Sequence, residues 1–210
     1  MKKINSLLLI FCFVLTNVFP QDEKVKNLLE SLSAKTKSYS SISIDFDYTI
    51  NNKNAGINEK NSGTLILKGE QFRIDLDKQL IINDGKINWV YLKEMNEVQI
   101  MDYDPEEDDM SPNKLITIYE EDYKSAYVET KSENGVQVHI IDLFPSKSGP
   151  FLKIRLTINA LKDQINTIVL SDKNGGTYSY KINSFKTDSN IPPFTFNKND
   201  YPGVKVIDLR

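Results

Sequence analysis

ISIDFDYTI, residues 42–50, carries the clearest structural pattern in the chain. Its odd-numbered positions are polar and its even-numbered positions are apolar. The apolar set is Ile42, Ile44, Phe46, Tyr48 and Ile50. Because successive side chains of a strand point to opposite faces, a period of two predicts a β-strand with one buried and one solvated face.

The same alternation recurs on both sides of this stretch, in short segments separated by turn residues. The turns are marked by Gly69-Glu70, Asn83-Asp84-Gly85 and Asn134-Gly135. The apolar positions of the segments are Leu65 and Leu67; Phe72, Ile74 and Leu76; Ile87, Trp89 and Tyr91; Val98 and Ile100; Val136, Val138 and Ile140; Leu152, Ile154, Leu156 and Ile158; Ile165 to Leu170; and Tyr178, Tyr180 and Ile182. Close turns between short strands, without alternating helices, predict an antiparallel meander.

Two segments have helical spacing instead. The apolar residues after Asp22 fall at offsets of three, four and seven, which predicts an amphipathic helix that ends near Lys37. Asp22 is predicted to cap the start of this helix. Ser111-Pro112 is a second helix start, with a capping hydroxyl followed by proline at the first helical position. The apolar residues of the two helices are Val25, Leu28, Leu29 and Leu32 in the first, and Leu115, Ile116 and Tyr119 in the second.

The number of strands constrains how these faces are buried. A sheet of roughly ten strands with one apolar face curls on itself or packs against another apolar surface. The two short helices are the other apolar surfaces that the sequence offers. We therefore expect one domain, a curled sheet with helices across its mouth.

Residues 1–20, MKKINSLLLIFCFVLTNVFP, have the layout of a secretory signal: Lys2 and Lys3, then an apolar run from Leu7 to Leu15, then a polar exit. The mature chain is then residues 21–210, a single domain without cysteine. Cys12 lies inside the apolar run after Phe11, which disfavours a lipid anchor. The expected product is exported and soluble in the cell envelope.

Charge argues against nucleic acid as a partner. Without Lys2 and Lys3 the chain has 24 basic and 29 acidic residues, a net charge of −5. A nucleic-acid-binding domain would present a basic face.

Motifs for covalent chemistry are missing from the sequence, which contains no GxSxG, GxGxxG, P-loop, HExxH or CxxC pattern. The single histidine, His139, is interpreted as a strand residue. The acidic stretch 102–109 lacks the glycine of a calcium-binding loop, so it is interpreted as a solvated loop. A weak calcium site and a partner-docking patch are the alternatives. We therefore expect no catalytic residue, no metal site and no cofactor.

A family resemblance emerges at Asp84-Gly85-Lys86. The run NDGKINWVY resembles the DGK-x-x-W-x-Y signature of the LolA family, periplasmic carriers of outer-membrane lipoproteins. Four further stretches agree with the family in order along the chain: Asn61 to Phe72, Ser111-Pro112 through Tyr119, Leu143-Phe144-Pro145, and the tail from Phe194 to Asp208. The family commonly has an arginine after the second strand that holds its lid closed, whereas this chain reads Lys68-Gly69-Glu70, with Arg73 further on.

The resemblance implies an incomplete antiparallel β-barrel of about eleven strands, mainly β with helices (α+β), whose N-terminal helix and helical lid cover the open side. It implies a periplasmic monomer that uses no cofactor and acts as a chaperone for lipoproteins in transit. Its cargo would be acylated lipoproteins, received from an inner-membrane ABC-type lipoprotein-releasing complex and passed to an outer-membrane acceptor. Which lipoproteins are carried does not follow from the sequence.

Strand alternation assigns the residues of the implied acyl-chain cavity. The inward set is Ile44, Phe46, Tyr48, Ile50, Leu65, Leu67, Phe72, Ile74, Leu76, Trp89 and Tyr91, and the lid set is Leu115, Ile116 and Tyr119. Two other functions remain open: an envelope sensor of lipid or lipoprotein built on the same domain, and an exported hydrolase that uses His139.

Overall fold

The computed structural model of the protein describes residues 20–108, 111–120, 123–188 and 190–210. The proposed signal segment therefore lies outside the described residues, except for Pro20. The helices are α1 (Pro20–Lys37), α2 (Pro112–Ile116) and the 3₁₀ turns η1 (Lys93–Met95), η2 (Ile118–Glu120) and η3 (Lys198–Asp200). The strands are β1 (Ile42–Asn52), β2 (Ile57–Lys68), β3 (Gln71–Leu76), β4 (Gln79–Asn83), β5 (Ile87–Leu92), β6 (Glu97–Asp102), β7 (Tyr123–Glu133), β8 (Val136–Pro145), β9 (Phe151–Asn159), β10 (Gln164–Asp172), β11 (Gly176–Thr187) and β12 (Lys205–Asp208).

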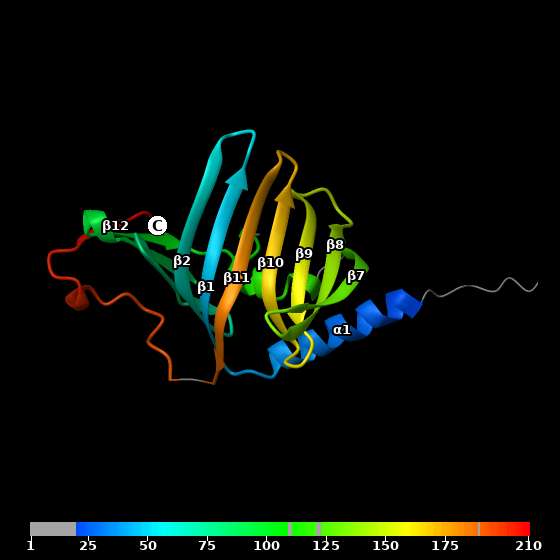
Figure 1. Ribbon diagram of the computed structural model, residues 1–210. Coiled ribbons are helices and arrows are strands. Elements are labelled where there is room, and N and C mark those ends of the chain that lie inside the picture. Colours follow the sequence, from blue (N-terminus) through cyan, green and yellow to red (C-terminus); the bar gives the residue numbers. More distant parts are fainter. Residues whose placement is uncertain (1–19, 109–110, 121–122, 189) are drawn as a thin grey trace, which may run out of the picture.

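All twelve strands form one curved sheet that does not close (Figure 1). Their order is β12-β6-β5-β4-β3-β2-β1-β11-β10-β9-β8-β7. Neighbours are antiparallel except β12, which runs parallel to β6. The predicted fold class, an incomplete β-barrel with helices, is confirmed, although the sequence patterns did not reveal β4, β7 or β12.

Strand β1 lies near the middle of the order and sets the inner face. It pairs with β2 and β11 over its whole length, so Ile44 stands beside Leu65 on one side and Phe185 on the other. Leu65 in turn stands beside Ile74 of β3. Since directly opposed residues share a face, these apolar side chains form a continuous inner row.

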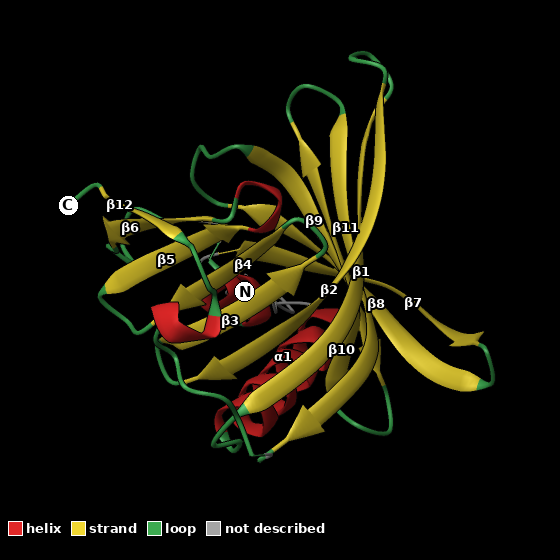
Figure 2. Ribbon diagram, turned by 90° about the vertical axis from the view of Figure 1, so that its left-hand side faces the viewer, coloured by secondary structure: helices red, strands yellow, loops and turns green. Residues whose placement is uncertain are grey.

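Helix α1 lies within the curve of the sheet, on its inner side (Figure 2). Its buried residues Val25 and Leu32 pack with Ile141, Leu156 and other residues of β8–β10. The helix begins at Pro20, so Asp22 lies inside it and the prediction that Asp22 is the cap is wrong. Its predicted end at Lys37 is confirmed.

The outer face of β3–β6 is also buried, because the C-terminal segment returns across it. Phe194 packs with Leu80 and Ile82 of β4. The ring of Tyr201 lies 4.5 Å from that of Tyr91 and 4.6 Å from that of Phe196, measured between centroids. This half of the sheet therefore has two apolar faces.

One strand departs from the predicted alternation. The β9–β10 pairing shifts between Ser171 and Asp172, so that Asp172 stands opposite Phe151. Leu152 is consequently exposed, and Phe151 packs against the core in its place. A β-bulge of this kind adds one residue to a strand and reverses the faces beyond it.

Candidate functional site

An apolar cavity of about 210 Å³ lies between the inner face of the sheet and α2. Its walls come from five strands and the short helix. The lining residues are Ile44, Phe46, Tyr48, Leu65, Ile74, Leu76, Pro112, Leu115, Ile116, Ile168, Tyr180 and Ile182. These described lining residues include no Asp, Glu, Lys, Arg, His or Cys, and their mostly apolar side chains are suited to sheltering apolar groups.

The structure brings together many of the residues that the sequence assigned to a cavity. Those at the cavity wall are Ile44, Phe46, Tyr48, Leu65, Ile74 and Leu76 from the strands, with Leu115 and Ile116 from α2. They meet because β1, β2 and β3 are neighbours in register and α2 lies across them.

Other assigned residues lie elsewhere. Leu67 and Phe72 are buried in the adjoining cluster on the inner face, beyond the cavity lining. Ile50 lies further along β1, opposite Glu59. Trp89 and Tyr91 are on the outer face, packed beneath the C-terminal segment, because the alternation of β5 does not show which of two apolar faces is inward.

Sequence reasoning missed Ile168, Tyr180 and Ile182 as cavity residues. All three lie on β10 and β11, which were predicted as strands without assigning their faces. Their signal was present, since Tyr180 and Ile182 alternate as the residues of β1 do. It required knowing that β11 pairs with β1, with Tyr48 opposite Tyr180.

Two tyrosines provide the polar atoms of the cavity. The rings of Tyr48 and Tyr180 stack with 6.2 Å between centroids, and burial raises the pKa of the Tyr180 hydroxyl. The amide of Asn61 donates a hydrogen bond of 3.2 Å to the hydroxyl oxygen of Tyr48. The Tyr48 end is therefore the polar end of the cavity.

Gly63 shapes the cavity wall next to this end. A Cβ at this position would lie 2.5 Å from Cδ2 of Leu76 and 2.8 Å from the backbone oxygen of Asp75. Only glycine lets β3 and Leu76 approach β2 this closely, so Gly63 helps to define the cavity shape.

The segment that carries α2 and η2, residues 111–120, covers the cavity and is called the lid below. Ser111 caps α2, since its hydroxyl accepts a hydrogen bond from the Lys114 backbone N–H, and Pro112 follows at the first position. Ile116 is buried against the inner face of the sheet. The predicted helix start at Ser111-Pro112 is confirmed.

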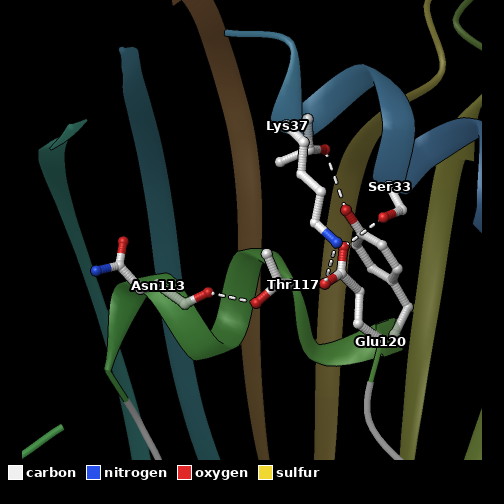
Figure 3. A network of polar contacts seen from close by, with 7 residues as sticks. Ser33, Lys37, Asn113, Thr117 and Glu120 are labelled. Carbon is white, nitrogen blue, oxygen red and sulfur yellow. Dashed lines mark hydrogen bonds and ion pairs between the residues drawn. The ribbon is translucent and has the colours of Figure 1, made fainter. Parts of the chain in front are cut away.

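Tyr119 joins the lid to α1 and is not among the residues that line the cavity. Its hydroxyl donates to the hydroxyl of Thr36 over 3.1 Å. Next to it, the Glu120 carboxylate accepts a hydrogen bond from Ser33 and lies 2.9 Å from the Lys37 ammonium (Figure 3). One end of the lid is therefore anchored to the last turn of α1.

The other end of the lid touches the turn between β2 and β3. The side-chain amide of Asn113 donates to the backbone oxygen of Glu70 over 3.2 Å. This is the turn Lys68-Gly69-Glu70, so a side chain of the lid bonds to the backbone of the turn.

Two of the groups that anchor the lid, Glu120 and Tyr119, have shifted pKa values. Burial alone would raise the pKa of Glu120, but the hydrogen bonds from Ser33 and Lys37 outweigh it and the net pKa is lowered. Burial raises the pKa of Tyr119 to about 12. At neutral pH the lid thus presents a carboxylate to Lys37 and a neutral phenol to Thr36.

His139 lies on β8, away from the cavity. Its Nδ1 is 2.9 Å from the hydroxyl of Thr130, and burial followed by the charge of Lys24 lowers its pKa. Within the described ranges no group of three or more His, Cys, Asp or Glu could hold a metal ion. Asp109, the end of the acidic stretch, falls outside those ranges.

Comparison with known proteins places this geometry in a family context. The family model described as "Outer membrane lipoprotein carrier protein LolA" matches residues 37–199. No curated protein matches the sequence. No helix in the part of the chain that the structure describes combines the length and the apolar character needed to span a bilayer.

Solved structures share the fold at low sequence identity. LprF from Mycobacterium bovis has a TM-score of 0.53 at 13% identity, over 81% of this chain and 97% of that one. An uncharacterized conserved protein from Thermus thermophilus has a TM-score of 0.52 at 12% identity, over 88% of this chain and 99% of that one. Both similarities concern the fold alone.

Proposed function

The chain belongs to the LolA family, and from this premise we propose that it carries lipoproteins from the inner to the outer membrane by sheltering their acyl chains beneath the lid. The observation that carries this proposal is the apolar cavity between β1–β3, β10, β11 and α2. Its strand walls are fixed by pairing in the sheet, whereas its cover is a five-residue helix.

The driving force is the removal of acyl chains from water. Each buried methylene contributes about 0.8 kcal/mol, so even part of one acyl chain provides substantial binding energy. The ring faces of Phe46, Tyr48 and Tyr180 add adaptable apolar surface.

The volume of the cavity requires movement of the lid. At about 210 Å³ it is smaller than the roughly 300–1,000 Å³ of usual ligand pockets, and a lipoprotein carries more than one chain. The polar anchors described above, from Asn113 at one end and from Tyr119 and Glu120 at the other, lie toward the two ends of the lid. We infer that acyl chains displace the lid, and that the closed lid fills the site when cargo is absent.

The finer parts of the proposal follow the family. Residues 1–20 would direct export and the mature domain, residues 21–210, would act in the periplasm as a monomer. It would receive cargo from an inner-membrane ABC-type releasing complex and deliver it to an outer-membrane acceptor. No covalent step and no cofactor are part of this scheme.

The test is whether purified protein keeps a triacylated lipoprotein soluble after detergent removal, measured by size-exclusion chromatography. Ile74→Asp places a charge in the cavity wall and should abolish the soluble complex, because burying an unpaired carboxylate is costly. Leu161→Asp, at a position that is 87% exposed, is the control and should retain it. A folded Ile74→Asp variant that carries cargo normally would contradict the proposal.

A further inference from the structure

A second pocket, polar and of about 550 Å³, adjoins the apolar cavity. We call it the vestibule. Its lining residues are Tyr48, Glu59, Lys60, Asn61, Leu76, Asp77, Lys78 and Gln79. Tyr48 and Leu76 line both spaces, so a molecule whose tail lies in the cavity would have its polar part in the vestibule.

The vestibule lies where β2 extends past β3. Strand β3 pairs only with Gly63–Lys68 of β2, whereas β1 pairs with β2 from Ile57 to Leu67. Among the described strands, the segment Ile57–Ser62 therefore has a partner on one edge only. In an antiparallel strand every second residue directs its N–H and C=O to the same edge, so this open edge offers a row of donors and acceptors.

Three of the vestibule residues, Glu59, Lys60 and Asn61, belong to this open segment. A row of unpaired backbone groups is matched best by another backbone. A lipid head group has no repeating donors and acceptors at strand spacing, whereas an extended peptide does.

The charges of the vestibule also fit a neutral peptide. Glu59 and Asp77 balance Lys60 and Lys78, and Asn61 and Gln79 contribute side-chain amides. Charged residues on an open edge oppose the stacking of whole sheets, but they leave room for one extended strand.

We propose that the vestibule and the open edge of residues 57–62 bind the polypeptide that follows the acylated residue of the cargo, as an added β-strand. This inference rests on the proposed function. It narrows the substrate class, because acylated polypeptides should bind better than free lipids that carry the same acyl chains. The acyl chains occupy the cavity, their linkage to the peptide lies near Tyr48, and the peptide leaves along β2.

The test compares four ligands with identical acyl chains by displacement of a fluorescent acyl probe. They are a diacylated peptide with six neutral residues, two versions N-methylated at the odd or at the even residues, and a phosphatidylcholine. We expect one N-methylated peptide to bind roughly tenfold more weakly and the other to bind normally, because only one set of N–H groups faces β2. Equal affinity of all three peptides would overturn the proposal.

Hydrogen exchange gives an independent readout. The unmodified peptide should slow amide exchange within residues 57–62, whereas phosphatidylcholine should not. Equal protection by both ligands, or by neither, would overturn the proposal.

The variant Ile74→Asp separates this proposal from the one on which it rests. If Ile74→Asp loses all four ligands while N-methylation has no effect, the acyl cavity stands and the strand site does not. If Ile74→Asp binds every ligand as well as the unmodified protein does, the carrier function itself fails.

Discussion

The ammonium of Lys37 lies 2.9 Å from the carboxylate of Glu120, which ties the last residue of α1 to the end of the lid. The Lys37 side chain is 64% exposed and that of Glu120 is 29% exposed. An ion pair this open contributes little to folding. A weak anchor fits the proposal that incoming acyl chains displace the lid.

Removing this ion pair should make the lid easier to displace. Lys37→Met is expected to raise the association rate and the affinity of a fluorescent acyl probe up to about fivefold, because exposed pairs contribute roughly 0.2–1 kcal/mol to the closed state. Stopped-flow fluorescence measures both. Lys26→Met is the matched control, since Lys26 pairs with Glu30 on the exposed face of the same helix. A slower or unchanged rate in Lys37→Met alone would contradict the role of this anchor.

The same anchor predicts a pH dependence. The folded pKa of Glu120 is lowered from its ordinary value of 4.5, so its contribution to lid closure is complete above that value and is lost as the pH falls through the lowered pKa. Probe association should therefore accelerate below pH 4.5. Glu120→Gln should be fast at neutral pH and show little further change on acidification. An identical pH profile in the variant would exclude Glu120 as the titrating group.

Gly63→Ala should damage the cavity wall. The new methyl group would meet Leu76 and the backbone of Asp75, and overpacking of this kind costs about 1–3 kcal/mol. We expect a lower melting temperature and weaker acyl-probe binding, as Leu76 is pushed from its place. Gly149→Ala is the control, because a Cβ there meets nothing within 4 Å. Normal probe binding by Gly63→Ala would show that the cavity tolerates a shifted wall.

Asp142 should matter for stability and not for cargo. Both of its carboxylate oxygens accept hydrogen bonds from Arg155, at 2.6 and 2.7 Å, and these bonds lower its pKa. Asp142→Ala is expected to cost about 2 kcal/mol in urea unfolding, because Asp142 is only 7% exposed. Asp208→Ala removes a similar but exposed pair with Arg210 and should leave unfolding unchanged. If folded Asp142→Ala bound the acyl probe with a different affinity from the wild-type protein, Asp142 would affect cargo binding as well as stability.

The sequence predicted the site best where only one face of a strand is buried. In β1, Ser43, Asp45 and Asp47 mark the outer face, so Ile44 and Phe46 could be assigned inward, and both line the cavity. In β5, Trp89 and Tyr91 alternate equally well but lie outward. The cause is Phe194 and its neighbours, which cover the outer face from a distant part of the chain.

Contacts between segments that are distant in the sequence could likewise not be predicted from local patterns. The β1–β11 pairing brings Tyr180 and Ile182 to the cavity, and nothing local to β11 specifies that partner. The short β12 pairs in parallel with β6, although its four residues carry no strong alternation. The start of α2 was more readable, because the Ser111-Pro112 cap acts within one turn, whereas the predicted cap Asp22 lies inside α1.

The unclosed sheet affects which cargoes can fit. A closed barrel has a girth fixed by its strand number and stagger. Here β7 and β12 end the sheet without bonding to each other among the described strands, so a small change of twist at each pair widens the interior while every ladder remains intact. If the protein carries lipoproteins as proposed, a sheet that can widen in this way would let one scaffold accept cargo with two or three acyl chains.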